Sequence, residues 1–237
     1  MIAKYKQTLP EVVYPALKED NFIVDEDEKL SIKQVLGMTP DHLIMSLNRY
    51  EKKKNVPLAV RAFSEFLKKT TNADHYHLVI AGGYDDAVTE NKEVYDELVA
   101  LAKELKVPES QIHFLRSVSN EERIALLDAT DVLLYTPENE HFGIVPVEAM
   151  YCGCIPLACN SGGPTESIAD GETGFLLDAD QPEQWGEKLM TIFKTEQSLK
   201  GMKTAGKKRV EDLFSFNAFV DQLTKVCLSL DEKKKKD

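Results

Sequence analysis

The chain has 237 residues, which is enough for one large domain or two small ones. Its net charge of −11 argues against nucleic acid or an anionic membrane as a partner of the whole surface, so a phosphate site has to be built locally. No apolar run approaches the length of a membrane span, and no N-terminal signal pattern is present. Cys152, Cys154 and Cys159 lack a fourth ligand at zinc-binding spacing, so we interpret them as small apolar side chains in a reducing compartment.

The first part of the chain has no strong hydrophobic periodicity. Residues 10–40 are polar and acidic, and we interpret them as an entry linker in which residues 12–14 form a possible edge strand. The first convincing strand starts near His42. At the other end, residues 231–237 are predicted to be a solvated, charged tail.

Six short apolar runs follow in the body of the chain. They are continuous rather than alternating, which is typical of strands buried on both faces by helices. The predicted strands are residues 42–47, 77–81, 112–115, 132–135, 155–158 and 174–177.

Amphipathic helices are predicted between these strands. Leu58, Ala62 and Phe66 share one apolar stripe, and Val94, Leu98 and Leu101 share another. Ser119 and Glu122 form a capping-box pattern at the start of a third helix. Three more helices are predicted at residues 182–194, 197–210 and 216–230. Repeated strand–helix pairs with short connections predict an α/β fold with a doubly wound, parallel, Rossmann-like sheet.

Ligands of such sheets bind at the carboxyl ends of the strands, where this sequence places its polar loops. Residues 48–55 leave the first strand, and Arg49 and Lys54 in this loop are candidates for holding one anion. A solvated basic turn explains the loop equally well. Gly82 and Gly83 follow the second strand and allow close backbone approach or simply a tight turn. A third glycine at dinucleotide-binding spacing is missing, so NAD binding is not supported.

Two further loops carry chemistry. Gly143 is predicted to open a helix whose N–H groups can receive an anion or sugar hydroxyls. Glu140 and Glu148 flank this helix start and are candidate acceptors for vicinal hydroxyl groups. A pair of surface glutamates is the alternative, but an unpaired carboxylate beside Val147 and Ala149 would be costly. Residues 160–166 join another strand to a helix, and their two glycines suggest close approach to the same ligand.

These motifs, in this order, resemble the GT-B glycosyltransferases of the large retaining group called group 1. Two glutamates separated by seven residues are that family's signature, and the match extends from about residue 43 to residue 177. The amino-acid sequence of residues 46–55, 81–85 and 139–146 is similar to that of the α-1,3/1,6-mannosyltransferases of dolichol-linked oligosaccharide assembly. The matching positions are Arg49, Lys54, Glu140, Phe142, Gly143, Glu148, Ala149, Met150, Ser161, Gly162, Gly163, Glu166, Gly171, Gly174 and Phe175.

The resemblance implies roles for these residues. Arg49 and Lys54 hold the donor diphosphate, Glu140 holds the transferred sugar, and Glu148 accepts hydrogen bonds from the ribose. Further donor contacts are implied for Gly82, Gly83, His141, Phe142, Gly143, Ile144 and Val145, with the base near Arg116, Ser117 and Val118. His141 is a candidate general base by residue type, and a loop residue that presents its backbone explains it at least as well. Because the basic pair supplies positive charge, we expect no metal and no other cofactor, and we interpret the Asp-rich spots at residues 25–27, 85–86 and 178–180 as solvated acids.

The resemblance also implies a larger enzyme. Residues 1–40 become an interdomain linker with a remnant of an N-terminal domain, and residues 41–230 the donor-binding domain. The implied donor is GDP-mannose and the implied acceptor a lipid-linked oligosaccharide, held by the missing domain. The full-length protein is expected on the cytosolic face of the endoplasmic reticulum, associated with the membrane, whereas this chain alone is expected to be soluble and inactive. The last helix, residues 214–230, is expected to expose an apolar face. Rival interpretations are a different nucleotide-sugar donor, a non-catalytic nucleotide-sugar-binding module, an epimerase or phosphorylase, and a scaffold domain.

Overall fold

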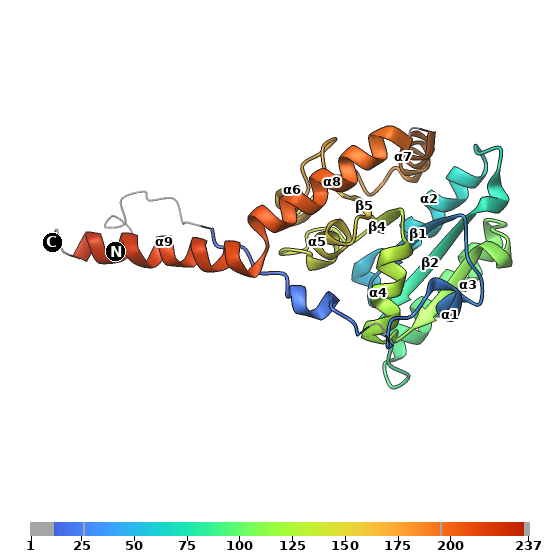
Figure 1. Ribbon diagram of the computed structural model, residues 1–237. Helices are drawn as coiled ribbons and strands as arrows, with labels where there is room; N and C mark the ends of the chain where they lie inside the picture. Colours follow the sequence, from blue (N-terminus) through green and yellow to red (C-terminus); the bar gives the residue numbers. More distant parts are fainter. Residues whose placement is uncertain (1–11, 26, 195, 235–237) are drawn as a thin grey trace, which may run out of the picture.

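The apolar runs of the sequence form one six-stranded parallel sheet in the computed structural model, which describes residues 12–25, 27–194 and 196–234 (Figure 1). The strand order is β3-β2-β1-β4-β5-β6, so the order reverses between β1 and β4. Each predicted strand is confirmed to within one residue at either end. The strands are β1 His42–Leu47, β2 Tyr76–Gly82, β3 Ile112–Arg116, β4 Val132–Tyr135, β5 Ile155–Cys159 and β6 Phe175–Leu177.

Helices cover both faces of the sheet, as the continuous apolar strands predicted (Figure 1). In β1, Ile44 packs with the helices of one face, whereas Leu43 and Met45 pack with those of the other. One face carries α2 Pro57–Leu67, α3 Thr89–Glu104 and α7 Pro182–Lys194, and the other α1 Ile32–Leu36, α4 Asn120–Ala129 and α5 Ile144–Tyr151. The remaining helices are α6 Pro164–Ser167, α8 Glu196–Leu213 and α9 Phe216–Lys234, with single 3-10 turns η1 Glu19–Phe22, η2 Lys52–Lys54, η3 Ala73–His75 and η4 Glu109–Gln111. The doubly wound Rossmann-like sheet is therefore confirmed.

The segment before the sheet differs from the prediction. Residues 12–18 have no regular secondary structure, so the possible edge strand at residues 12–14 is wrong. The reason lies in what the segment packs against. Leu17 is 2% exposed and its N–H donates to the carbonyl of Phe214 at 2.7 Å, and Tyr14 meets the Phe214 ring edge to face at 5.3 Å. The segment thus uses a helix end, rather than a sheet edge, as its hydrogen-bond partner.

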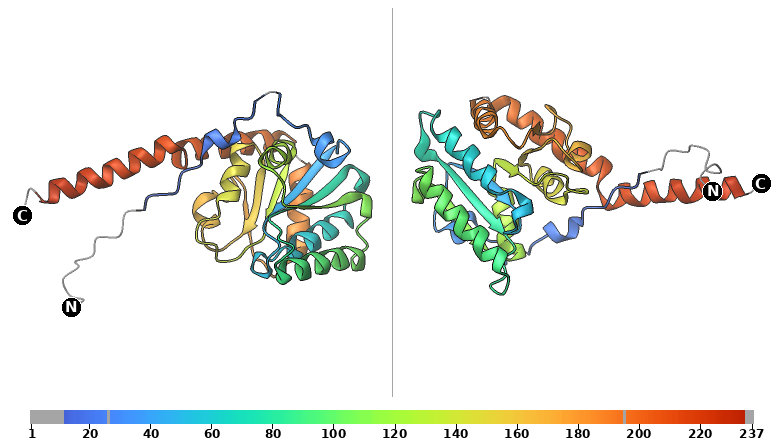
Figure 2. Two further views of the ribbon diagram at one scale, coloured as in Figure 1. Left: turned by 90° about the horizontal axis from the view of Figure 1, so that it is seen from below. Right: turned by 180° about the vertical axis from the view of Figure 1, so that it is seen from behind.

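The last helix, α9, extends away from the body of the domain, and the N-terminal segment lies beside its first part (Figures 1 and 2). Its exposed apolar side chains confirm the expected apolar face, except that Phe214, just before the helix, is buried. The exposed residues are Phe216, Val220, Leu223 and Leu228. Residues 231–234 of the predicted tail continue α9, and residues 235–237 lie outside the described part. Among the described helices, none is both long and apolar enough to cross a bilayer.

Candidate active site

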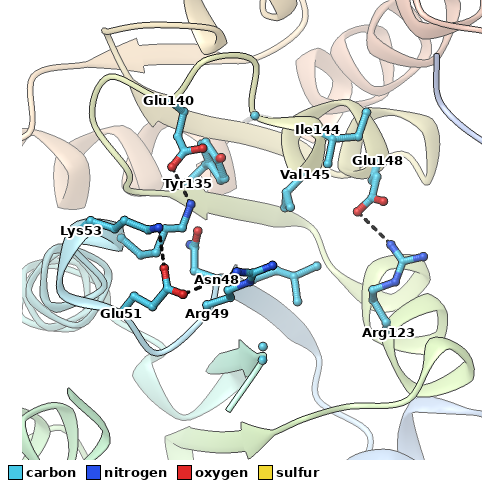
Figure 3. Close-up of a pocket in the computed structure, with 15 residues that line it drawn as sticks. Asn48, Arg49, Glu51, Lys53, Arg123, Tyr135, Glu140, Ile144, Val145 and Glu148 are labelled. Carbon is cyan, nitrogen blue, oxygen red and sulfur yellow. Dashed lines mark hydrogen bonds and ion pairs between the residues drawn. The ribbon is translucent and has the colours of Figure 1, made fainter. Parts of the chain in front are cut away.

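A cavity of about 520 Å³ lies at the carboxyl ends of β1, β2 and β4 (Figure 3). This is the point where the strand order reverses, which is where ligands of open α/β sheets bind. Four basic side chains and three carboxylates line the cavity, giving it a local charge of +1 in a chain whose net charge is −11. The lining residues with charge are Arg49, Lys53, Lys54, Arg123, Glu51, Glu140 and Glu148. A locally positive pocket in an acidic protein is suited to an anion such as a diphosphate.

The loop after β1 places Lys54 beside Glu140. Lys54 Nζ lies 2.5 Å from Glu140 Oε1, and both side chains are mostly buried, at 16% and 24% exposed. Two contacts fix the loop: the Thr136 hydroxyl donates to the Lys54 carbonyl at 2.7 Å, and the Tyr50 N–H donates to the Gly83 carbonyl at 3.1 Å. The loop is therefore tied to the ends of β4 and β2 on either side of the cavity.

Two other basic groups of this loop, Arg49 and Lys53, share one carboxylate. Arg49 Nη1 lies 3.6 Å from Glu51 Oε1, and Lys53 Nζ lies 3.0 Å from Glu51 Oε2. The bond to Lys53 lowers the pKa of Glu51, so this carboxylate stays charged. The Arg49 side chain is 73% exposed, which leaves its guanidinium accessible to a ligand.

Helix α5 begins at the cavity. Gly143 is its N-cap with φ of +72°, and a Cβ there would lie 3.0 Å from the Tyr135 hydroxyl. Because Gly143 has no side chain, it cannot cap the N–H groups of the first turn, where the residues Ile144 and Val145 line the cavity. These groups and the helix dipole favour an anion at this place.

Glu148 lies at the opposite side of the cavity from Glu140, and Arg49 lies between them (Figure 3). Glu148 Oε2 is 2.8 Å from Arg123 Nη1 on α4, and the two side chains are 16% and 19% exposed. Burial raises the pKa of Glu148, and Arg123 partly offsets that rise. The Glu148 carboxylate is therefore paired, and the pairing offsets the free-energy cost that an isolated charge beside Val147 and Ala149 would have.

The protein-family comparison agrees with this geometry. Residues 28–209 match the model of the family described as glycosyl transferases group 1. The chain belongs to this family.

Relatives within the group 1 glycosyltransferases cover most of this chain. It is 45% identical to the alpha-1,3/1,6-mannosyltransferase ALG2 of Mus musculus over 90% of this chain and 51% of that protein, and 42% identical to the human enzyme of the same name over 93% and 53%. The chain thus spans about half the length of these curated relatives. Among solved structures, the sucrose-phosphate synthase of Thermosynechococcus elongatus superimposes with a TM-score of 0.76 at 20% identity, covering 93% of this chain and 52% of that one. The C-terminal domain of a group 1 glycosyl transferase from Francisella tularensis superimposes with a TM-score of 0.65 at 22% identity, covering 86% of this chain and 97% of that one. At these identities, the two structures show a shared fold.

The cavity of this group 1 domain brings together most of the residues that the sequence singled out. They come from four separate segments of the chain, at the ends of β1, β2 and β4 and in α5 (Figure 3). The predicted residues that line it are Arg49, Lys54, Gly82, Gly83, Glu140, Gly143, Ile144, Val145 and Glu148. Their contacts with a donor stay predictions.

Five predicted donor contacts lie outside the cavity lining: Arg116, Ser117, Val118, His141 and Phe142. The Arg116 guanidinium sits 4.9 Å from the centre of the Tyr84 ring, and the Ser117 hydroxyl donates to the Tyr84 carbonyl at 2.6 Å. His141 is exposed. The ring of Phe142 packs with Tyr14 and Phe214 instead. A base contact at residues 116–118 stays a prediction.

The glycines of the loop at residues 160–166 approach protein backbone. A Cβ at Gly162 would lie 2.4 Å from the Glu140 carbonyl, and one at Gly163 would lie 2.1 Å from the Phe142 carbonyl. Neither glycine lines the cavity. These glycines allow the Glu140 loop to rest on the start of α6. Their close approach to a ligand stays a prediction.

Sequence reasoning missed six lining residues: Leu47, Asn48, Glu51, Lys53, Arg123 and Tyr135. Five of them lie at the end of β1, in the loop after it or at the end of β4, and could have been included by extending each predicted loop to its full length. Arg123 is different, because its place at the cavity depends on how α4 packs beside α5. Among the described residues, no group of three or more His, Cys, Asp or Glu side chains is placed to hold a metal ion.

Proposed function

We propose that this domain holds the donor of a retaining mannosyltransferase and that the donor is GDP-mannose. The observation that carries the proposal is the locally positive cavity at the reversal of strand order, bounded by Glu140 at one end and Glu148 at the other. The family match supports sugar transfer from a nucleotide sugar, and the names of the relatives support mannose as the sugar.

Each wall of the cavity has a part in this proposal. Arg49 and Lys54 bind the diphosphate and stabilise the negative charge that grows on it as the bond to the anomeric carbon breaks. The N–H groups at the start of α5 add to that stabilisation. Glu140 orients the mannose and Glu148 accepts from the ribose hydroxyls. Because these basic groups already supply positive charge, the proposed mechanism requires no metal.

The acceptor in this proposal is a lipid-linked oligosaccharide, the precursor of N-glycans. It is held by an N-terminal domain that precedes the donor-binding domain at residues 41–230, with residues 1–40 linking the two. The full-length enzyme works at the cytosolic face of the endoplasmic reticulum in association with its membrane. The chain alone is therefore expected to bind nucleotide weakly and to transfer no sugar. Detectable mannosyl transfer by the chain alone would contradict the proposal that donor and acceptor are held by different domains.

Calorimetric titration with GDP, UDP and ADP tests the proposal. We expect GDP to bind best and Arg49→Ala to weaken it at least about tenfold, since one charged contact to a phosphate is lost. Arg61→Ala is the matched control, because Arg61 is exposed on α2 and does not line the cavity. The affinity for GDP is expected to be unchanged by a chelator of divalent metals.

Other outcomes discriminate between the rival functions. A preference for UDP would replace GDP-mannose by another donor while leaving a group 1 transferase. Binding of none of the three nucleotides would refute the proposed donor site.

A further inference from the structure

Arg123 lies at the end of the cavity opposite Lys54 and has no role in the function proposed above. It is on α4, whose start is fixed by the predicted capping box: the Ser119 side chain accepts from the Glu122 N–H, and the Glu122 side chain accepts from the Ser119 N–H. Figure 3 shows its side chain reaching from α4 toward Glu148 on α5. The ion pair therefore bridges two helices that border the cavity.

The guanidinium of Arg123 is held from several sides. Nη1 lies 2.8 Å from Glu148 Oε2, while Nη2 donates to Asn120 Oδ1 at 2.9 Å. The guanidinium carbon sits 5.1 Å from the centre of the Phe22 ring. Asn120 in turn donates from Nδ2 to the carbonyl of Asn21 at 3.2 Å. The turn η1 and Asn120, the first residue of α4, thus orient the Arg123 guanidinium, and this group in turn orients Glu148.

These contacts require an arginine. A guanidinium can direct two nitrogens at two acceptors in fixed geometry while its flat face stacks on an aromatic ring, whereas a lysine presents one point charge. The ion pair with Arg123 has two effects on the Glu148 carboxylate. It opposes the effect of burial, which favours the neutral acid, and it fixes the position of one oxygen, Oε2. Within the described residues Oε1 has no hydrogen-bond donor, which leaves it available to a ligand in the cavity.

We propose that Arg123 is a positioning residue of the donor site: it holds Glu148 charged and in one orientation so that this carboxylate accepts hydrogen bonds from the ribose hydroxyls. The inference rests on the proposed function, because it needs a nucleotide in the cavity. It predicts that Arg123 contributes to affinity through the ribose and not through the phosphates, which Arg49 and Lys54 hold.

A comparison of two nucleotides isolates this contribution. GDP and 2′,3′-dideoxy-GDP carry the same phosphates and base, and they differ in the hydroxyls that Glu148 is proposed to bind. We expect the unmodified chain to prefer GDP by about tenfold or more, the value of a hydrogen bond to a charged group. Arg123→Gln is expected to reduce that preference to about twofold or less, by weakening GDP and leaving the dideoxy nucleotide nearly unchanged.

Two further variants separate positioning from folding. Arg123→Lys retains the charge and should recover part of the preference for GDP. Asn120→Ala removes the contact to Nη2 from a residue that does not line the cavity, and should lower the preference by a smaller factor. Arg61→Gln is the matched control and should keep the preference of the unmodified chain. The thermal unfolding midpoint of every variant shows that the comparison is made on folded protein.

The possible results separate a failure of the positioning role from a failure of the proposed donor site. If Arg123→Gln stays folded and still prefers GDP as strongly as the unmodified chain, or loses affinity for both nucleotides equally, the positioning role is overturned, while Arg49→Ala still reports on the donor site. If the unmodified chain binds neither nucleotide, the donor site itself is refuted and the role of Arg123 with it.

Discussion

Replacing Gly82 by alanine tests how tightly the base of the cavity is built. Gly82 ends β2 with φ of +152°, a conformation that residues with side chains rarely adopt. A Cβ placed there would lie 1.8 Å from the carbonyl oxygen of Asn48, which follows β1. The Cβ would be fixed rigidly to the backbone of β2, and the carbonyl oxygen belongs to the backbone directly after β1, so no side-chain rotation can relieve the clash.

The expected cost has two parts. The unfavourable φ contributes about 1–3 kcal/mol, and forcing the two strand ends apart contributes about 1–3 kcal/mol more, as overpacking does in other interiors. Gly153 is the matched control, because its φ of +80° is also left-handed but a Cβ there would meet nothing within 4 Å. Gly153→Ala therefore carries about 1 kcal/mol of backbone strain alone. The two variants should differ by about 3 kcal/mol in the free energy of unfolding.

Urea denaturation of both variants measures this difference directly, and thermal unfolding gives a second reading. For a domain of this size, about 3 kcal/mol corresponds to a separation of roughly 6–12 °C between the two midpoints. The reasoning is refuted if Gly82→Ala unfolds within about 1 kcal/mol of Gly153→Ala, since the strands would then move apart at little cost.

Two other predictions concern cysteine and histidine side chains. Cys227 is exposed, whereas burial raises the pKa of Cys152 to about 12. Iodoacetamide should therefore label one thiol quickly, and Cys227→Ser should abolish this fast phase. A second thiol that reacts quickly would contradict the burial of the other cysteines. Burial also lowers the pKa of the neighbouring His77 and His113, so folding favours their neutral forms and the unfolded chain binds more protons in acid. Stability from this source is present above about pH 6.5 and is lost as the pH falls below it, and His113→Gln should lose less stability than the unmodified chain when urea midpoints at about pH 8 and pH 5.5 are compared.

Much of the fold was readable because the sheet is buried on both faces. Continuous apolar runs such as residues 132–135 mark such strands directly, and each run is followed by the polar loop that lies at the carboxyl edge of the sheet. Arg49, Lys54 and Glu140 could therefore be placed at one cavity from their positions after strands. The helix α1 was missed, although Ser31 and Gln34 form a capping box and Gly37 ends the helix in the left-handed conformation.

The parts that could not be predicted depend on packing between segments distant in sequence. Arg123 precedes Glu148 by two elements, and nothing in either helix alone indicates that α4 turns this side chain toward α5. Gly162 and Gly163 were assigned to a ligand because glycines after a strand permit close approach, and the sequence does not say what approaches. In the structure, it is the backbone of the loop that carries Glu140.

The spacing of the two glutamates has a structural reason that the loop contacts explain. The Glu140 carbonyl accepts from the Gly163 N–H at 2.8 Å, and the Phe142 ring packs 5.7 Å from Phe214, so the loop is held on both sides before α5 begins. From Ile144, the first residue of α5, four residues of helix carry the chain about 6 Å along the axis to Glu148. Seven intervening residues thus combine a fixed loop with one helical turn, which places one carboxylate at each end of the cavity. One residue more within the helix would rotate Glu148 by about 100°, away from both the cavity and Arg123, so the spacing follows from the geometry of the helix.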